Sequence, residues 1–346
     1  MSNKIIINQY PKQKYSTFFN QLNGAFIRIE DEGEPEPFWS EKGPELMDIS
    51  ITNWCDKGCS FCYRNSNSGG EHMSMSDYEH ILKEAVDCKV LQIALGGGNP
   101  NQHPNFCEIV EITRDLGIVP SYTTNGRGLS EKILKTTKKN CGAVAVSAYE
   151  PYYEMKEAIH KLKAKRIKTN IHFLLTSNSI DTVISWFEDP PNFFNYINAI
   201  IFLNYKPIGK HPSLKLIANK HNKIDKFFNL ISNQKRIKVG FDSCSISGIA
   251  QYLDINPSFV ESCEAARFSM YISEDLKMYP CSFMAGKYDG IDLSKNSIQD
   301  AWRYSTLFRD FRKHIKNSEC KSCKHNQLCF GGCPIFPEIN FCDRRG

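Results

Sequence analysis

The sequence lacks the features of a secreted, membrane-bound or repetitive protein. Its longest apolar stretches, AIIF and IHFLL, fall far short of the roughly 20 apolar residues that a membrane-spanning helix needs. The N-terminus, MSNKIIINQYPKQK, has neither the apolar segment nor the small-residue cleavage site of a signal peptide. A net charge of +5, with Lys and Arg scattered among Asp and Glu, gives no concentrated basic patch for nucleic acid. We therefore expect a cytoplasmic protein that binds neither membranes nor nucleic acids.

Cysteine is abundant instead, with 14 residues in the chain. Disulfides are rare in a reducing cytoplasm, so the candidates are core thiols, catalytic thiols and metal ligands. Eight of the 14 cysteines lie between Cys244 and Cys342, and three more lie in CDKGCSFC at 55–62. The spacing within these two groups has to decide between the candidates.

The order of apolar and amphipathic segments predicts an α/β protein. Residues 1–45 contain a predicted β-hairpin with its turn at Asn23-Gly24, and residues 46–240 alternate between short strands and amphipathic helices, as in βα units around a parallel sheet. The predicted strands lie at about 46–52, 90–96, 118–123, 143–148, 168–175 and 198–204. The helix after the first strand is predicted to be capped by Ser76 and to bury Tyr78, Ile81, Leu82 and Ala85.

The pattern loosens after about residue 240. Residues 241–346 are rich in cysteine and contain one strongly predicted helix, from about Ser297 to His314, with Ser297 and Asp300 placed as a capping box. This region is therefore predicted to be a small metal-stapled domain.

Cys55, Cys59 and Cys62 form CxxxCxxC directly after the first predicted barrel strand. This places them on a loop at the carboxyl end of the sheet, where βα barrels keep their chemistry. Three thiolates from one loop are suited to three corners of an iron–sulfur cube, which leaves one iron open to a substrate or cofactor. The alternatives are a zinc site completed by a distant residue, or three unrelated thiols.

With Phe61 before its last cysteine, this motif resembles the radical S-adenosylmethionine (SAM) enzymes. The resemblance implies a partial (β/α)6 TIM-like barrel, open on one side, in which SAM chelates the free iron. It also implies that one-electron reduction of SAM yields a 5′-deoxyadenosyl radical that abstracts hydrogen from a substrate.

A glycine-rich turn, LGGGNP at 95–100, follows the second predicted strand. It is not a P-loop, because no GK[ST] follows. In the family, GGE lies beside the amino group of SAM, and Gly97, Gly98 and Asn99 match that motif with Asn in place of Glu. An amide oxygen accepts a hydrogen bond but carries no charge, so we expect a weaker ammonium contact. Ser147 and Asn170, near the ends of later strands, are further candidates for the cofactor pocket.

The C-terminal cysteines resemble the SPASM domain, an iron–sulfur extension of radical SAM enzymes. The spacing Cx2Cx5Cx3C, followed by one more cysteine and preceded by two upstream, matches its order; the residues are Cys263, Cys281, Cys320, Cys323, Cys329, Cys333 and Cys342. One departure is Leu276, where the family has a glycine five residues before the second cysteine. A hairpin turn at Asp275-Leu276 must therefore form without the permissive residue.

The resemblance implies three four-iron clusters, one in the barrel and two auxiliary. Cys320, Cys323, Cys329 and Cys342 would hold one auxiliary cluster, and Cys263, Cys281 and Cys333 would hold the other. Cys244 is the candidate for the missing fourth ligand, with hydrogen donation to a substrate radical or an inert core position as alternatives. Cys88, Cys107 and Cys141 are predicted to be core thiols. Structural zinc is the alternative for the whole tail.

SPASM-containing enzymes mostly act on polypeptides, which implies maturation of a ribosomally made precursor peptide by crosslinking, epimerisation or backbone excision. Alternatives are sulfatase-maturase-like oxidation of a protein residue, a small-molecule radical enzyme, and a zinc-stapled binding protein. The first 45 residues are too few for a fused leader-recognition domain, so we expect none, or one on a separate protein, together with an external electron donor. Lys206 and His211 follow the sixth strand and are either pocket residues or parts of a solvated loop.

Overall fold

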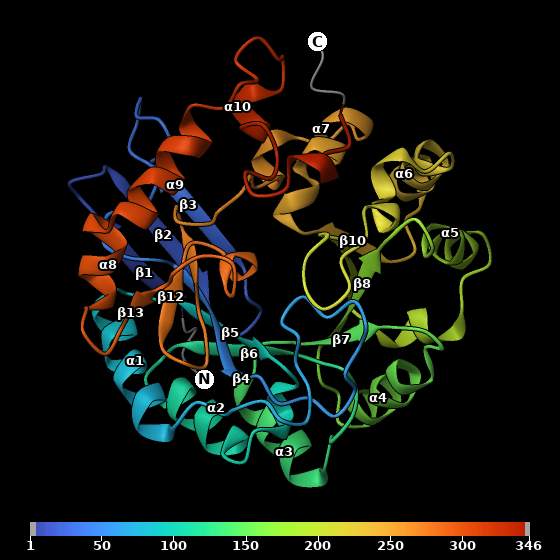
Figure 1. The fold of residues 1–346 in the computed structure, drawn as a ribbon, viewed down its shortest axis with the longest axis horizontal. Coiled ribbons are helices and arrows are strands. Elements are labelled where there is room, and N and C mark those ends of the chain that lie inside the picture. The colour runs from blue at the N-terminus through green and yellow to red at the C-terminus, as the bar shows by residue number, and fades with distance from the viewer. Residues whose placement is uncertain (1–4, 343–346) are drawn as a thin grey trace.

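A computed structural model describes residues 5–342. Residues 1–4 of the predicted N-terminal segment and residues 343–346 of the predicted C-terminal domain lie outside the described residues. The main sheet has ten strands in the order β10-β9-β8-β7-β6-β5-β4-β11-β12-β13 and ends at β10 and β13 without closing. Helices line the outer side of this curved sheet in Figure 1. The C-terminal helix at residues 298–304 packs beside the helix at 75–87, and the C-terminal helices at 246–252 and 326–329 lie at the top of the view, between the two ends of the sheet. The α/β prediction of a partial barrel is confirmed.

The six predicted barrel strands are all present and run parallel. They are β4 (Leu46–Thr52), β5 (Gln92–Gly97), β6 (Val119–Thr124), β7 (Val144–Ala148), β8 (Thr169–Leu175) and β9 (Ala199–Asn204). The outer helices are α1 (Met75–Asp87), α2 (Phe106–Asp115), α3 (Glu131–Asn140), α4 (Tyr153–Ala164), α5 (Ile180–Glu188) and α6 (Ile224–Asn233). Phe173 of β8 packs against Trp186 of α5, so by alternation His172 faces the barrel interior.

Helix α1 buries Tyr78, Ile81, Leu82 and Ala85, as the periodicity predicts. The predicted cap at Ser76 is wrong. Ser74 is the N-cap residue, and its hydroxyl oxygen accepts a hydrogen bond from the backbone N–H of Asp77 at 3.1 Å. Serine at 74 and serine at 76 are equally good caps by residue type, and the helix begins at Met75.

The N-terminal segment forms a separate antiparallel sheet, β1 (Ile5–Tyr10), β2 (Tyr15–Asn20) and β3 (Phe26–Glu30). The predicted hairpin is β2–β3, and β1 was not predicted because three consecutive isoleucines hide the alternation of a strand. Phe19 packs against Leu91 and Val119, at the amino ends of β5 and β6. This sheet therefore contacts the end of the barrel opposite the cysteine loop.

The C-terminal region continues the main sheet. β10 (Lys238–Phe241) pairs with β9, and β11 (Ser269–Ile272) pairs in parallel with β4. β12 (Lys277–Tyr279) and β13 (Ile291–Asp292) follow in antiparallel order. The predicted turn without glycine forms at Leu276, which has a left-handed φ of +60°.

The predicted helix at 297–314 is two helices, α8 (Ile298–Tyr304) and α9 (Thr306–Lys316). Ser297 caps α8 as predicted, by accepting a hydrogen bond from the N–H of Asp300. Ser305 leaves the helical conformation and caps α9, which breaks the predicted continuous helix. The other α-helices described in this region are α7 (Ile246–Tyr252) and α10 (Asn326–Cys329). None of the described helices is long and apolar enough to span a bilayer.

Candidate functional site

The three cysteines of CxxxCxxC lie on the loop that leaves the carboxyl end of β4. Each thiol is half-buried. The loop is compact, because the N–H of Cys62 donates to the carbonyl of Cys59 at 3.1 Å and that of Cys55 donates to Asn67 at 2.9 Å. Burial raises the pKa of Cys59 to about 11, Lys57 lowers it, and the neighbouring thiols of Cys62 and Cys55 raise it further. The thiols of Cys55 and Cys62 thus lie close enough to Cys59 to act on its thiol.

The glycine-rich turn after β5 lies against the backbone that leads into this loop. The N–H of Gly98 donates to the carbonyl of Thr52 at 2.6 Å, and that of Asn99 donates to Trp54 at 3.0 Å. A Cβ on Gly98 would lie 2.0 Å from the Trp54 oxygen, and one on Gly97, with φ of +114°, would lie 2.0 Å from the Thr52 oxygen. Glycine is therefore required at both positions for this close backbone approach.

Asn99 is fully buried, and its side-chain oxygen already accepts two hydrogen bonds from the protein. The donors are the Thr124 hydroxyl and the Asn125 N–H, each at 3.1 Å. An amide oxygen has two lone pairs, so a direct bond to the ammonium of a cofactor would require one of these donors to move. The predicted cofactor contact of Asn99 stays a prediction.

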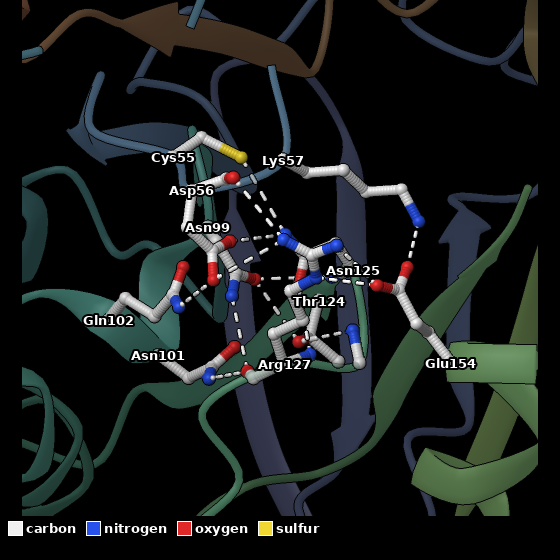
Figure 2. Close-up of polar contacts among 11 residues, drawn as sticks. Cys55, Asp56, Lys57, Asn99, Asn101, Gln102, Thr124, Asn125, Arg127 and Glu154 are labelled. Atoms are coloured by element: carbon white, nitrogen blue, oxygen red, sulfur yellow. Dashed lines mark hydrogen bonds and ion pairs between the residues drawn. The ribbon is translucent and has the colours of Figure 1, made fainter. Parts of the chain in front are cut away.

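Asn125, which follows β6, lies next to the cysteine loop and was not predicted from the sequence. Figure 2 shows its side chain pointing toward Cys55, with Arg127 and Glu154 completing a polar network. The Asn125 Nδ2 lies 3.6 Å from the Cys55 sulfur. The signal that could have found it is the Thr-Asn-Gly sequence at the carboxyl end of a predicted strand, which is also typical of an ordinary turn.

Ser147 and Asn170 occupy different ends of the barrel. Ser147 lies near the carboxyl end of β7, where it hydrogen-bonds Tyr149, whose ring packs 4.9 Å from that of Phe61 in the cysteine loop. Asn170 is the second residue of β8, at the amino end, where its side-chain oxygen accepts a hydrogen bond from Asn198 at 2.9 Å. The structure does not bring Asn170 to the cysteine loop, because the strand runs five further residues before it reaches that edge.

The structure brings Cys244 together with Cys263, Cys281 and Cys333, the auxiliary cluster ligands for which the resemblance supplies no fourth member. Its thiol hydrogen-bonds that of Cys333, and this bond, followed by burial, raises its pKa well above the usual range. Burial raises the pKa of Cys263 as well, with smaller effects from the charges of Cys244 and Cys281. Burial also raises the pKa of Cys281 to about 12, and Cys244 again contributes. The four thiols form one group, here called the buried group, in which Cys263 and Cys333 are buried and Cys244 and Cys281 are half-buried.

The remaining C-terminal cysteines form a second group nearer the surface. Burial raises the pKa of Cys329 to about 11, with contributions from Cys342 and Cys320. Cys323 is exposed, and its N–H donates to the carbonyl of Cys320 at 3.0 Å. Within residues 5–342, no three Cys, His, Asp or Glu side chains are drawn together closely enough to hold a single metal ion.

Lys206 lies beside the buried group, whereas His211 is exposed. Only 5% of Lys206 is exposed, and its ammonium forms an ion pair with Asp242. Burial lowers the pKa of Lys206, but Asp242, Cys244 and Cys333 outweigh this and raise it overall. Lys206 is therefore charged and faces the thiols.

A second buried ion pair connects the cysteine loop to the tail. Arg64 donates through Nη2 to both carboxylate oxygens of Glu274, at 2.9 and 2.7 Å, and the Ser50 hydroxyl donates to the same carboxylate at 2.7 Å. Glu274 lies in the β11–β12 turn. Sequence reasoning could not find this pair, because 210 residues separate its members.

The three cysteines predicted to be core thiols lie on the outer helices of the barrel, apart from the two C-terminal cysteine groups. Cys88 is buried at the end of α1, while Cys107 and Cys141 are half-buried on α2 and at the end of α3. Burial raises the pKa of Cys88 and of Cys141 to about 12. Protonated thiols of this kind behave as small apolar side chains.

Comparison with known proteins gives two family matches and several relatives. Residues 49–187 match the radical SAM superfamily, and residues 263–324 match SPASM, an iron–sulfur cluster-binding domain. The chain is 22% identical to the mycofactocin maturase MftC of Mycobacterium tuberculosis over 311 residues, which cover 84% of this chain and 78% of MftC. It is 23% identical to the cysteine-type anaerobic sulfatase-maturating enzyme of Clostridium perfringens over 347 residues, covering 83% and 88% of the two chains.

The fold is similar to that of Streptococcus suis SuiB. The structure of SuiB bound to S-adenosylmethionine matches with a TM-score of 0.74 and 17% identity, and that of SuiB bound to its precursor peptide SuiA matches with a TM-score of 0.73 and 16% identity; each comparison covers 99% of both chains. Both family matches lie on the regions that carry the two kinds of cysteine motif. The chain is therefore a radical SAM superfamily enzyme with a C-terminal SPASM domain.

Proposed function

We propose that this protein modifies a ribosomally made precursor peptide by radical chemistry. Cys55, Cys59 and Cys62 would hold a four-iron cluster, with SAM on its open iron. Bound there, these groups supply the electron and the 5′-deoxyadenosyl radical that abstracts a hydrogen from the substrate. The chain's own residues bind, position and shield this chemistry.

One observation carries the proposal: the buried cysteine group of the tail lies at the same end of the barrel as the CxxxCxxC loop. The loop after β9 connects them. Its Lys210 N–H donates to the Cys62 carbonyl at 3.4 Å, while its Lys206 faces Cys244 and Cys333. A site with an auxiliary redox group next to the radical source suits a reaction in which the substrate radical gains or loses an electron.

We further propose that Cys244 is the fourth ligand of an auxiliary cluster held by Cys263, Cys281 and Cys333. Its position within the buried group supports this role over hydrogen donation or an inert core position. Cys320, Cys323, Cys329 and Cys342 would hold the second auxiliary cluster, which gives three clusters in all. The reducing cytoplasm that we expect for the protein would keep these thiols available.

A peptide substrate is supported by the relatives and by the open sheet. SuiB binds its precursor peptide SuiA, and MftC is a mycofactocin maturase. A sheet that ends at β10 and β13 without closing leaves a side along which an extended chain can approach. A separate leader-recognition protein and an external electron donor remain proposed partners.

The ion pair of Arg64 and Glu274 has a positioning role in this proposal. It fixes the residue two places after Cys62 to the turn between β11 and β12, so the cysteine loop and the tail hold one geometry. Both side chains are at least 88% buried, because their exposed fractions are 9% and 12%. A buried pair with this many hydrogen bonds holds its geometry better than an exposed one.

The deciding experiment measures iron and sulfide per chain after anaerobic reconstitution, and then 5′-deoxyadenosine formed from SAM under reduction. About twelve irons per chain are expected for three clusters. Peptides encoded beside the gene are then co-expressed with the enzyme and examined by mass spectrometry. Zinc without iron would overturn the proposal, and modification of a neighbouring sulfatase instead of a peptide would favour the function of the C. perfringens relative.

A further inference from the structure

The orientation of the Asn125 carboxamide is set by the protein around it. Its oxygen accepts a hydrogen bond from the backbone N–H of Arg127 at 2.9 Å. The amino group must therefore face the other way, where it lies 3.6 Å from the sulfur of Cys55 and 3.3 Å from a carboxylate oxygen of Asp56. Asn125 is 9% exposed, so water has little access to this contact.

Asn99 holds Asn125 in that orientation. Its oxygen accepts from the Asn125 N–H, and its amino group donates to the carbonyl of Arg127 at 3.2 Å, so it contacts both ends of the turn. The amino group of Asn101 donates to the same carbonyl at 2.7 Å. A glutamate at position 99 would have no N–H to donate, so the departure from GGE coincides with a structural task that only an amide performs here.

The turn is also attached to the cysteine loop from outside. Arg127 donates to the backbone carbonyl of Asp56 at 3.2 Å and to the carboxylate of Glu154 at 2.5 Å. Lys57 forms an ion pair with the same glutamate. Gln102 donates at 2.9 Å to Oδ2 of Asp56, the carboxylate oxygen that Asn125 does not contact. Figure 2 shows these contacts converging on the residues next to Cys55. The distance between Asn125 and the sulfur is thereby held from two sides.

We propose that the carboxamide of Asn125 donates an N–H···S hydrogen bond to Cys55 that raises the reduction potential of the radical-generating cluster, and that Asn99 positions it. This inference rests on the proposed cluster at Cys55, Cys59 and Cys62. Reduction adds negative charge to the cluster and its thiolates. A donor aimed at one sulfur stabilises the reduced form more than the oxidised form, and hydrogen bonds to sulfur are among the factors that set cluster potentials. Asn125 is a positioning residue that acts through Cys55.

The test is a redox titration of the full chain, monitored by EPR. The radical-generating cluster is identified as the signal that changes when SAM is added, which separates it from auxiliary clusters. Asn125→Leu removes the donor at similar volume, and Asn125→Asp keeps the acceptor for Arg127 but turns a carboxylate toward the sulfur. We expect a lower midpoint in Asn125→Leu and a still lower one in Asn125→Asp.

Asn198→Leu is the matched control, because Asn198 is a half-buried amide of the same barrel that bonds Asn170 at the opposite edge. Its midpoint should equal that of the parent. If Asn125→Leu fails to retain the cluster, the midpoint potential of Asn125→Asp is the measurement that tests the inference. A SAM-sensitive signal with an unchanged midpoint in Asn125→Asp overturns the inference and leaves the proposed function intact. Absence of any SAM-sensitive signal in the parent overturns the proposed function instead.

Discussion

The ring of Tyr63, one residue after Cys62, lies 4.6 Å from the ring of Phe283, two residues after Cys281. The ammonium of Lys206 lies 4.8 Å from the centre of the same Phe283 ring, over its face. The CxxxCxxC loop and the buried group that contains Cys281 are therefore joined by an aromatic contact next to a buried cation. Under the proposed function, a substrate placed between them would meet the radical source on one side and an auxiliary cluster that can accept an electron on the other.

Replacing Cys59 by alanine should remove the radical-generating cluster while leaving the tail clusters. We expect about four irons fewer per chain and loss of 5′-deoxyadenosine formation, since a cube on two thiolates from this loop is poorly held. Iron analysis and chromatography of the nucleoside products measure both. Full nucleoside formation in Cys59→Ala would refute the assignment of this loop.

Cys244→Ala distinguishes a ligand from a hydrogen donor. A ligand role predicts loss of iron from one auxiliary cluster and a changed EPR signal that is insensitive to SAM. A donor role predicts unchanged iron content and altered product only. Cys107→Ala serves as the control, because its thiol is half-buried on α2 away from both groups. We expect the iron content of Cys107→Ala to match the parent and that of Cys244→Ala to fall.

Gly98→Ala should disrupt the approach of the glycine-rich turn to the cysteine loop. Its new Cβ would lie 2.0 Å from the Trp54 carbonyl oxygen, so the backbone has to move, at a cost of about 1–3 kcal/mol or more. Gly96→Ala is the matched control, since nothing lies within 4 Å of its Cβ position. Binding of SAM, measured by calorimetry, should weaken in Gly98→Ala and persist in Gly96→Ala. Equal binding in both variants would contradict the proposed close approach.

Lys206→Met should destabilise the protein, because it leaves the Asp242 carboxylate, whose side chain is only 18% exposed, without its cation. Breaking one side of a buried pair typically costs about 3–5 kcal/mol. The double variant Lys206→Met/Asp242→Asn removes both charges and should recover much of that loss. Thermal unfolding under anaerobic conditions measures the three proteins. If the double variant is less stable than Lys206→Met, the charge explanation fails.

Asp48 predicts a pH dependence of stability. It lies on β4 between the core residues Met47 and Ile49, so by alternation its side chain faces the barrel interior. Burial, with a smaller contribution from Glu264, raises its pKa from 3.8 to about 7. Between pH 3.8 and about 7 the folded protein holds a proton that the unfolded chain releases, so stability falls as pH rises through this window. From pH 5.5 to 7.5 we expect a loss of about 2 kcal/mol from this group. Asp48→Asn should flatten this slope in chemical unfolding; an unchanged slope would show that other groups cause it.

Local patterns predicted the parts of the fold that depend on nearby residues. The six barrel strands and the buried face of α1 follow from side-chain periodicity, and the division of the C-terminal cysteines into two groups follows from the resemblance to the SPASM domain. The pairing of β11 with β4 could not be predicted, because it joins residues more than 200 positions apart through backbone hydrogen bonds that leave no trace in either segment alone. The break at Ser305 was missed because serine is tolerated within helices as well as at their starts.

The candidate site was predictable where it depends on residue type and spacing, and not where it depends on contacts across the fold. Cys55, Cys59 and Cys62 are recognisable by their intervals. Asn125 carries the same turn signal as many surface loops, and only the structure shows its amino group directed at a sulfur. The glycine-rich motif indicates Asn99 as a site residue, but the two hydrogen bonds that its side-chain oxygen accepts from Thr124 and Asn125 cannot be predicted from the sequence.

The pairing of β11 with β4 also bears on how such enzymes can be recombined. A chain cut after residue 241 would leave the backbone of Leu46–Ile49 as a bare sheet edge, and bare edges promote aggregation. The tail is thus not a detachable module in the engineering sense. A chimera that exchanges tails between relatives has to carry a strand that matches β4 in register, and a barrel expressed without its tail needs a replacement strand to stay monomeric.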